Sequence, residues 1–234
     1  MVILACDSSA KPCSVAVLED EKLIYQCFLN NKLTHSETLM PMIENALFLS
    51  GYDLSKVDLL AVSKGPGSFT GVRIGVSAVK GIAMGRKIPC VGVSTLKAMA
   101  YNHKSCGKII CCVMDARRNQ VYNGIFEFNQ GKLEILNDDR AISIEELKEE
   151  IINLKKDVIL VGDGADLCYN NMKELKNVCP ADENVKYQTG YGVALCGKNL
   201  FEEGSYDDFL TLVPGYLRKS QAQRELEEKQ KRND

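Results

Sequence analysis

The stretch Val2-Ile3-Leu4-Ala5-Cys6-Asp7-Ser8-Ser9 near the start of the chain decides the fold. A short apolar run that ends in an aspartate is typical of a buried strand followed by a polar turn. The same pattern returns at residues 109–115, IICCVMD, where Asp115 ends the run. The repetition predicts two halves of similar construction, each beginning with a buried strand.

The residues after each of these strands predict the same order of elements: strand, strand, strand, helix, strand, helix. Capping boxes at Thr34–Glu37 and Ser143–Glu146 mark the first helix of each half. In the first half we expect strands at 2–6, 13–18, 23–29, 57–63 and 88–93, and helices at 34–50, 70–85 and 94–101. In the second half we expect strands at 109–114, 121–128, 132–136 and 158–161, and helices at 143–154, 165–175 and 191–203. This order predicts an α/β fold with two mixed sheets.

The repeat also divides the chain into subdomains. We expect residues 1–103 to form the N-terminal subdomain and residues 104–213 the C-terminal one. Residues 214–234, which begin Pro-Gly-Tyr-Leu-Arg, lie beyond the second half and are expected to pack back onto the first.

Composition limits the classes of function. The 234 residues carry a net charge of −2, which does not suit a protein that binds nucleic acid by charge alone. There is no basic signal region and no apolar run of the ~18 residues that span a bilayer. The ten cysteines form no C-x-x-C pair. We therefore expect a cytoplasmic protein with reduced thiols and no membrane contact, and leave the role of adjacent Cys111 and Cys112 open.

A glycine-rich segment, Gly65–Gly75 (GPGSFTGVRIG), joins a strand to a helix. It matches neither the Walker A loop nor the dinucleotide-binding pattern. Two interpretations remain: close packing of the helix, or a phosphate site at the helix N-terminus. Asp7 could correspondingly be a turn residue or could position magnesium near phosphates. The candidate nucleotide-proximal turn consists of Asp7, Ser8, Gly65, Gly67 and Ser68.

Metal chemistry has little support in the sequence. The only histidines are His35 and His103, and neither H-x-x-x-H nor H-E-x-x-H occurs. Because the two histidines lack neighbouring cysteines or carboxylates at ligand spacing, we expect no metal site.

The helix expected at 34–50 has more apolar residues than one stripe requires. One stripe can face the sheet of its own subdomain. The remaining apolar side chains need another cover, which a partner or the core could provide.

Taken together, these segments resemble the TsaB (YeaZ) family, the dimerisation subunit of the bacterial tRNA threonylcarbamoyladenosine system. The matching segments are residues 3–9, 14–17, 35–43, 65–75, 92–96, 115–118 and 214–218. Departures are small: Cys6 replaces the usual aliphatic residue and Ser8 the usual Thr. The turn Gly162-Asp163-Gly164-Ala165 is poorly suited to hold phosphates. This weakens the hypothesis that the chain is an ATPase on its own.

The resemblance implies an actin-like ASKHA fold, related to ribonuclease H, with two similar subdomains. It also implies a non-catalytic scaffold. In that system the paralogue TsaD carries the metal and transfers threonylcarbamoyl to N6 of adenosine 37 in tRNAs that read ANN codons. The ATPase TsaE joins the complex. The resemblance implies that ATP and magnesium act in the assembled complex and that this chain alone holds no cofactor. It also implies that the chain contacts tRNA only through the complex. In isolation the chain could form a homodimer.

The resemblance further implies that the helices at 34–50 and 70–85 form the partner interface. The expected interface residues are His35, Leu39, Met42, Ile43, Ala46, Arg73, Val76, Val79 and Lys80. Two rival functions are an ASKHA-type ATP-dependent phosphotransferase, with Asp7 holding the magnesium nucleotide, and a peptidase, which the missing histidine ligands disfavour.

Overall fold

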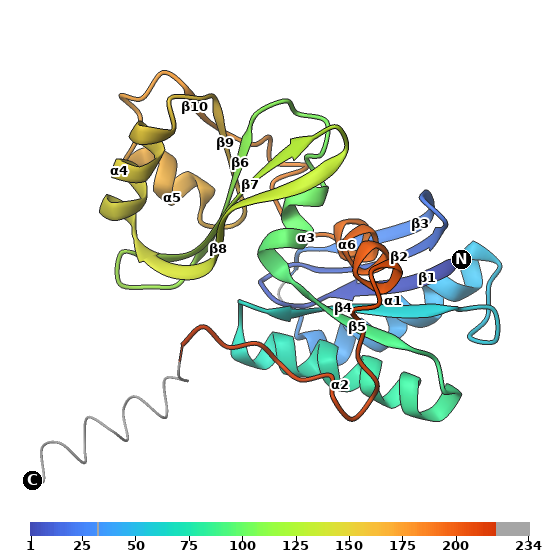
Figure 1. The fold of residues 1–234 in the computed structure, drawn as a ribbon. Coiled ribbons are helices and arrows are strands. Elements are labelled where there is room, and N and C mark those ends of the chain that lie inside the picture. The colour runs from blue at the N-terminus through green and yellow to red at the C-terminus, as the bar shows by residue number, and fades with distance from the viewer. Residues whose placement is uncertain (32, 219–234) are drawn as a thin grey trace, which may run out of the picture.

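The computed structural model describes residues 1–31 and 33–218, and it contains two five-stranded sheets with helices packed on their faces (Figure 1). The first sheet has the strand order β3-β2-β1-β4-β5 and the second has the order β10-β9-β6-β7-β8. The second order, read in reverse, is β8-β7-β6-β9-β10. In both halves the strands then follow one another as third, second, first, fourth and fifth. The α/β duplication predicted from the sequence is therefore confirmed.

The first half comprises β1 (Val2–Asp7), β2 (Cys13–Glu19), β3 (Lys22–Leu29), α1 (His35–Ser50), β4 (Leu59–Gly65), α2 (Phe69–Arg86), β5 (Cys90–Ser94) and α3 (Thr95–Tyr101). The second comprises β6 (Ile109–Asp115), β7 (Gln120–Asn129), β8 (Lys132–Ser143), α4 (Ile144–Leu154), β9 (Val158–Val161), α5 (Ala165–Asn170), β10 (Val178–Pro180) and α6 (Gly190–Glu202). In each half the first strand pairs antiparallel with the second strand and parallel with the fourth.

Three elements differ from the sequence prediction. β8 continues to Ser143 because its polar stretch, residues 137–140, still pairs with β7 across two register shifts. α5 ends at Asn170, five residues early, where the side-chain amide of Asn171 donates to the Leu167 carbonyl. The chain then turns into β10, a three-residue strand that the apolar pattern did not reveal.

Both faces of the central strand β1 are buried, and each packs on different helices. Val2, Leu4 and Cys6 face the core formed with α1 and α2. Ile3 and Ala5 face the core formed with α6. Because successive side chains of a strand point to opposite faces, this near-continuous apolar run needs helices on both sides.

The last helix of each half packs on the sheet of the other half. α6 follows the second sheet in sequence but lies on β1, β2, β4 and β5 (Figure 1). α3 contributes Leu96, Met99 and Ala100 to the core beneath β6 and β7. The expected subdomain of residues 104–213 must therefore be corrected for α6, because the apolar face of α6 completes the first sheet.

The segment after α6 returns to the first half. The Asp207 carbonyl accepts a hydrogen bond from the Cys90 backbone, and the Gly215 amide donates to the Lys64 carbonyl at 2.6 Å. Residues 219–234, which were also expected to pack there, lie outside the described residues.

The adjacent cysteines Cys111 and Cys112 are packing residues on opposite faces of β6. Cys111 lies in the core with α4 and α5, and Cys112 lies in the core with α3. Burial raises the pKa of both thiols, so both remain protonated at neutral pH. Between residue 1 and residue 218, leaving aside residue 32, no helix combines the length and apolar character needed to cross a membrane.

The exchanged helices predict that both halves unfold together. Leu96 of α3 is fully buried, so Leu96→Ala should lower the free energy of unfolding by about 2–5 kcal/mol. Leu210→Ala, at a side chain that is 70% exposed, should change it by less than about 0.5 kcal/mol. Urea unfolding followed by far-UV circular dichroism and by tyrosine fluorescence should show one coincident transition. Two separated transitions in the wild-type chain would contradict the structural exchange.

Candidate functional site

A cleft of about 670 Å³ lies between the two halves, where the carboxyl ends of β1 and β6 meet. Open α/β sheets commonly bind ligands at such strand ends. The residues that line the cleft are Ser9, Ala10, Lys11, His35, Gly67, Ser68, Phe69, Thr70, Met114, Asp115, Ala116, Arg117, Tyr122 and Asp163. The cleft thus brings together the turn after β1, the N-terminus of α2 and the turn after β6.

Asp7 lies below this cleft and does not line it. Its Oδ1 accepts hydrogen bonds from the Ser9 backbone at 2.9 Å and the Ser9 hydroxyl at 2.8 Å. Its Oδ2 accepts from the Ser63 hydroxyl, and the side chain has no exposed surface. Burial raises the pKa of Asp7, while these hydrogen bonds and nearby His35 oppose the increase. The geometry is that of a structural turn aspartate whose oxygens already have partners.

The glycine-rich segment packs directly on the turn after β1. The Ser68 amide donates to the Ser9 carbonyl at 2.6 Å, and the Ser8 hydroxyl donates to the Gly71 carbonyl at 2.9 Å. A Cβ added to Gly67 would lie 2.2 Å from the Ser9 carbonyl oxygen, and one added to Gly71 would lie 2.0 Å from that of Ser8. The predicted nucleotide-proximal residues therefore do come together, and their contacts match the close-packing interpretation.

Gly65 has a different neighbour. A Cβ there would lie 2.3 Å from the Gly215 carbonyl oxygen, so this glycine admits the returning C-terminal segment. Ser68 caps α2 by accepting a hydrogen bond from the Gly71 amide at 3.2 Å.

His35, at the first position of α1, lies at the edge of the cleft. Its Nε2 is 2.7 Å from the Ala10 carbonyl, and because a carbonyl only accepts, Nε2 carries the proton. His103 makes a similar bond to the Val185 carbonyl at 3.0 Å, and burial lowers its pKa. His35 ties helix α1 to the turn after β1, and His103 ties the turn after α3 to the loop that contains Val185. The described residues contain no group of three or more His, Cys, Asp or Glu arranged to hold a metal.

Six of the expected interface residues lie in the core of the first half. Leu39, Met42, Ile43, Ala46, Val76 and Val79 are each at most 9% exposed and face the sheet. The resemblance implied that these residues face a partner, whereas here they lie on the inner stripes of α1 and α2 and pack on this chain's own sheet.

Arg73 and Lys80 project outward from α2 but bind the returning C-terminal segment. Arg73 Nε donates to the Tyr216 hydroxyl at 2.7 Å, and Lys80 Nζ donates to the Leu212 carbonyl at 3.0 Å. The ring of Tyr216 stacks on Phe69, with 4.2 Å between centroids. These two cations therefore hold a strap, defined here as residues 212–218, against α2 (Figure 1).

The strap then reaches the second half. The Arg218 guanidinium donates to the Ala116 carbonyl at 3.0 Å and lies 5.8 Å from the centroid of the Tyr122 ring. Sequence reasoning named the PGYLR motif but missed this bridge and missed Tyr122 and Asp163 in the cleft. The alternation of aromatic and basic residues in the motif was the available signal.

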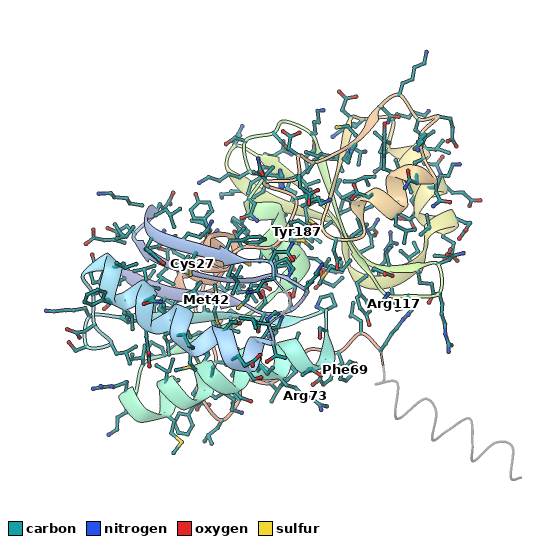
Figure 2. The ribbon with its side chains drawn as sticks, turned by 180° about the vertical axis from the view of Figure 1, so that it is seen from behind. Cys27, Met42, Phe69, Arg73, Arg117 and Tyr187 are labelled. Carbon is teal, nitrogen blue, oxygen red and sulfur yellow. The ribbon has the colours of Figure 1, made fainter. Side chains whose placement is uncertain are left out.

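The outer face of α1 and α2, turned away from the sheet, carries the side chains that are open to a partner. On α1, Met40 is 42% and Phe48 80% exposed, and on α2 Met84 is 65% exposed. Within residues 1–31 and 33–218, a Cβ added to Gly81 or Gly85 of α2 would meet no atom within 4 Å. We call Met40, Phe48, Gly81, Met84 and Gly85 the outer face. Figure 2 shows α1 and α2 side by side, with the inward Met42 and the α2 residues Phe69 and Arg73 labelled.

Known proteins of similar sequence share this architecture. A profile for the family described as TsaD, tRNA N6-adenosine threonylcarbamoyltransferase, matches residues 30–225. The tRNA threonylcarbamoyladenosine biosynthesis protein TsaB of Bacillus subtilis is 31% identical over 239 residues, which cover 99% of this chain and 100% of that protein. TsaB of Escherichia coli is 30% identical over 233 residues, covering 97% and 98% respectively.

Solved structures agree on the fold. A Pseudomonas aeruginosa protein described as similar to peptidase YeaZ matches with a TM-score of 0.78 and 24% identity, covering 93% of this chain and 99% of that one. The ROK hexokinase of Thermus thermophilus, an actin-like protein, matches with a TM-score of 0.52 and 9% identity, covering 87% and 100%. With the full-length sequence relatives, these likenesses establish that the chain belongs to the TsaB (YeaZ) family and has the actin-like ASKHA fold.

Proposed function

We propose that this chain serves tRNA threonylcarbamoyladenosine biosynthesis as a non-catalytic scaffold that binds the paralogous transferase TsaD and, with it, the ATPase TsaE. Family membership supports the pathway, because the full-length relatives are named for it. The match to the TsaD profile supports a partner of the same fold. In this proposal ATP and magnesium act in the assembled complex, in the cytoplasm.

The outer face of α1 and α2 is the observation that carries the scaffold proposal. Glycine inside a helix is less favourable than alanine by about 1 kcal/mol, and Gly71 and Gly75 offset that cost by packing against Ser8. At Gly81 and Gly85 an added Cβ would meet no atom of the described residues, so no such packing offsets the cost there. Together with exposed Met40, Phe48 and Met84, they form a surface that another helix pair can approach closely. A partner of the same fold has such a pair.

The rival phosphotransferase needs an open carboxylate at Asp7 and free backbone donors near it. Asp7 is sealed by Ser9 and Ser63, and the Ser68 amide is taken by the Ser9 carbonyl. These contacts favour the scaffold over the phosphotransferase.

The first prediction concerns Gly81→Leu. The new Cβ would meet no atom of the described residues within 4 Å, and leucine replaces a poor helix former, so the free energy of unfolding should rise by about 0.5–1 kcal/mol. Association with TsaD should nevertheless weaken more than about tenfold, because the bulk blocks close helix approach. Sedimentation velocity of the mixed proteins measures the association. Asn153→Leu, at an exposed position of α4, is the matched control and should bind normally. Equal association of both variants would overturn the interface.

The second prediction concerns the need for this chain. Threonylcarbamoyl transfer to tRNA by TsaD and TsaE, with the threonylcarbamoyl adenylate supplied, should require the chain. Restoration should saturate at one copy per TsaD, because a scaffold acts by stoichiometric binding. Modified adenosine is measured by mass spectrometry of digested tRNA. Equal modification when the chain is omitted would refute the proposed function.

The third prediction concerns the structural role of Asp7. Its folded-state pKa is raised, so the wild-type chain loses stability as pH rises from the unfolded-state value towards the folded one. Asp7→Asn removes that titration. The free energy of unfolding of the variant minus that of wild type should therefore be more positive at pH 7 than at pH 4. The variant thus gains stability relative to wild type as the pH rises. Urea titrations at the two pH values measure the difference, and a change in the opposite direction would count against a buried structural carboxyl.

A further inference from the structure

The mouth of the interdomain cleft carries exposed cations from both halves, although the chain as a whole has a net charge of −2. Lys11, from the turn after β1, and Arg117, from the turn after β6, line it from opposite halves. Arg73 and Arg218 lie beside it along the strap. Figure 2 shows Arg117 on the same side of the molecule as Phe69 and Arg73. We call Lys11, Arg73, Arg117 and Arg218 the basic rim.

The turn that carries Arg117 is held in an unusual backbone conformation. Arg117, Arg118 and Asn119 have φ values of 65°, 57° and 56°. Residues other than glycine seldom adopt such positive φ values. Three neighbours hold the turn: the Asp115 carboxylate accepts from the Arg117 amide at 2.7 Å, the Asn119 carbonyl accepts from the Ile144 amide, and Arg218 bonds the Ala116 carbonyl. Such conformations persist where surrounding structure imposes them, and they gather at binding sites. Here the result is a fixed turn whose Arg117 side chain is 88% exposed.

Two carboxylates, Asp115 and Asp163, share the cleft with these cations. Asp163 accepts a hydrogen bond from the Asp115 amide at 3.2 Å and is itself exposed. Asp115 pairs with Arg117 at 3.6 Å, and its side chain is 34% exposed against 88% for that of Arg117. The Arg117 guanidinium therefore extends further into solvent than the carboxylate with which it pairs.

Aromatic rings alternate with the rim cations. The Arg73 guanidinium lies 5.5 Å from the Phe69 centroid and 5.6 Å from that of Tyr216, and Arg218 lies over Tyr122. Tyr216 is 41% exposed. Positive charge interleaved with aromatic rings suits a nucleic-acid strand, because phosphates pair with the cations and bases stack on the rings. An acidic protein segment would use the cations alone.

We propose that the basic rim binds the sugar–phosphate backbone of the tRNA substrate directly, so that this chain contributes to substrate binding as well as scaffolding. The proposal rests on the proposed function, which supplies the RNA, but it makes a separate claim about Lys11 and Arg117. Each phosphate contact releases counterions, so the contribution of the rim should depend on salt.

The test is the affinity for tRNA of the complete assembly with TsaD and TsaE. Fluorescence anisotropy of end-labelled tRNA would be measured between about 50 and 200 mM salt. The double variant Lys11→Gln/Arg117→Gln should bind about tenfold more weakly near 100 mM salt, and the slope of log affinity against log salt should become shallower by about two. Arg86→Gln is the matched control. It lies at the far end of α2, about 25 Å along the helix from the cleft but next to the outer face, so sedimentation must first show that this variant still assembles with TsaD; its affinity and slope should then be unchanged.

Two accompanying measurements separate the outcomes. Thermal unfolding of the double variant should match wild type, because both side chains are exposed, and sedimentation should show an intact assembly. Unchanged affinity and slope would overturn the rim proposal. The proposed function, which the omission experiment tests separately, would be unaffected. Weaker subunit association with an unchanged salt slope would assign the rim to an acidic protein surface and would also overturn it. A failed omission experiment would instead remove the proposed function itself.

Discussion

Burial of both faces of β1 and of β6 is the constraint on which the rest of the structure depends. Each half supplies two helices that cover one face of its own sheet, α1 with α2 and α4 with α5. The other face of each sheet is covered by the last helix of the other half. Since neither sheet can be left with an open apolar face, the two halves must fold against each other. That requirement places the carboxyl ends of β1 and β6 together and creates the cleft between them.

The contacts within the cleft show how this fold can close the turn at which other α/β folds bind ligands. Ligand-binding members of α/β folds keep the turn after a central strand open, so that backbone amides and a helix N-terminus face the ligand. Here Ser8 and Ser9 fill that space and use the Ser68 amide and the Gly71 carbonyl. Gly67 and Gly71 permit the approach because any side chain would collide with the Ser8 and Ser9 carbonyls. In the sequence these glycines suggest a phosphate-binding loop. In the structure they instead let the turn after β1 occupy the space that a phosphate would need.

Much of the fold could be predicted because the signals were local. Capping boxes at Thr34 and Ser143, alternating apolar strands and aspartates at the ends of β1 and β6 all depend on neighbours in sequence. The placement of α6 could not be predicted, because its apolar face fits either sheet and only the packed chain decides between them. Six of the interface residues that the family resemblance supplied lie in the core instead of on the surface. Periodicity identifies which stripe of a helix is apolar, and the most regular stripe, Leu39 to Ala46, is the one that the chain's own core takes.

Exposed glycine is a better guide to a partner surface than exposed apolar area in α2. Apolar side chains on a surface are common in monomeric proteins and individually say little. A helical glycine without a neighbour is different, because it lowers helix stability and gains no packing in return. Gly75 is explained within the chain by Ser8 and Val62, whereas Gly81, less than two turns further along the same helix, is not. The difference between these two positions locates the point at which α2 stops packing against the described part of its own subdomain and exposes the backbone that the proposed partner would approach.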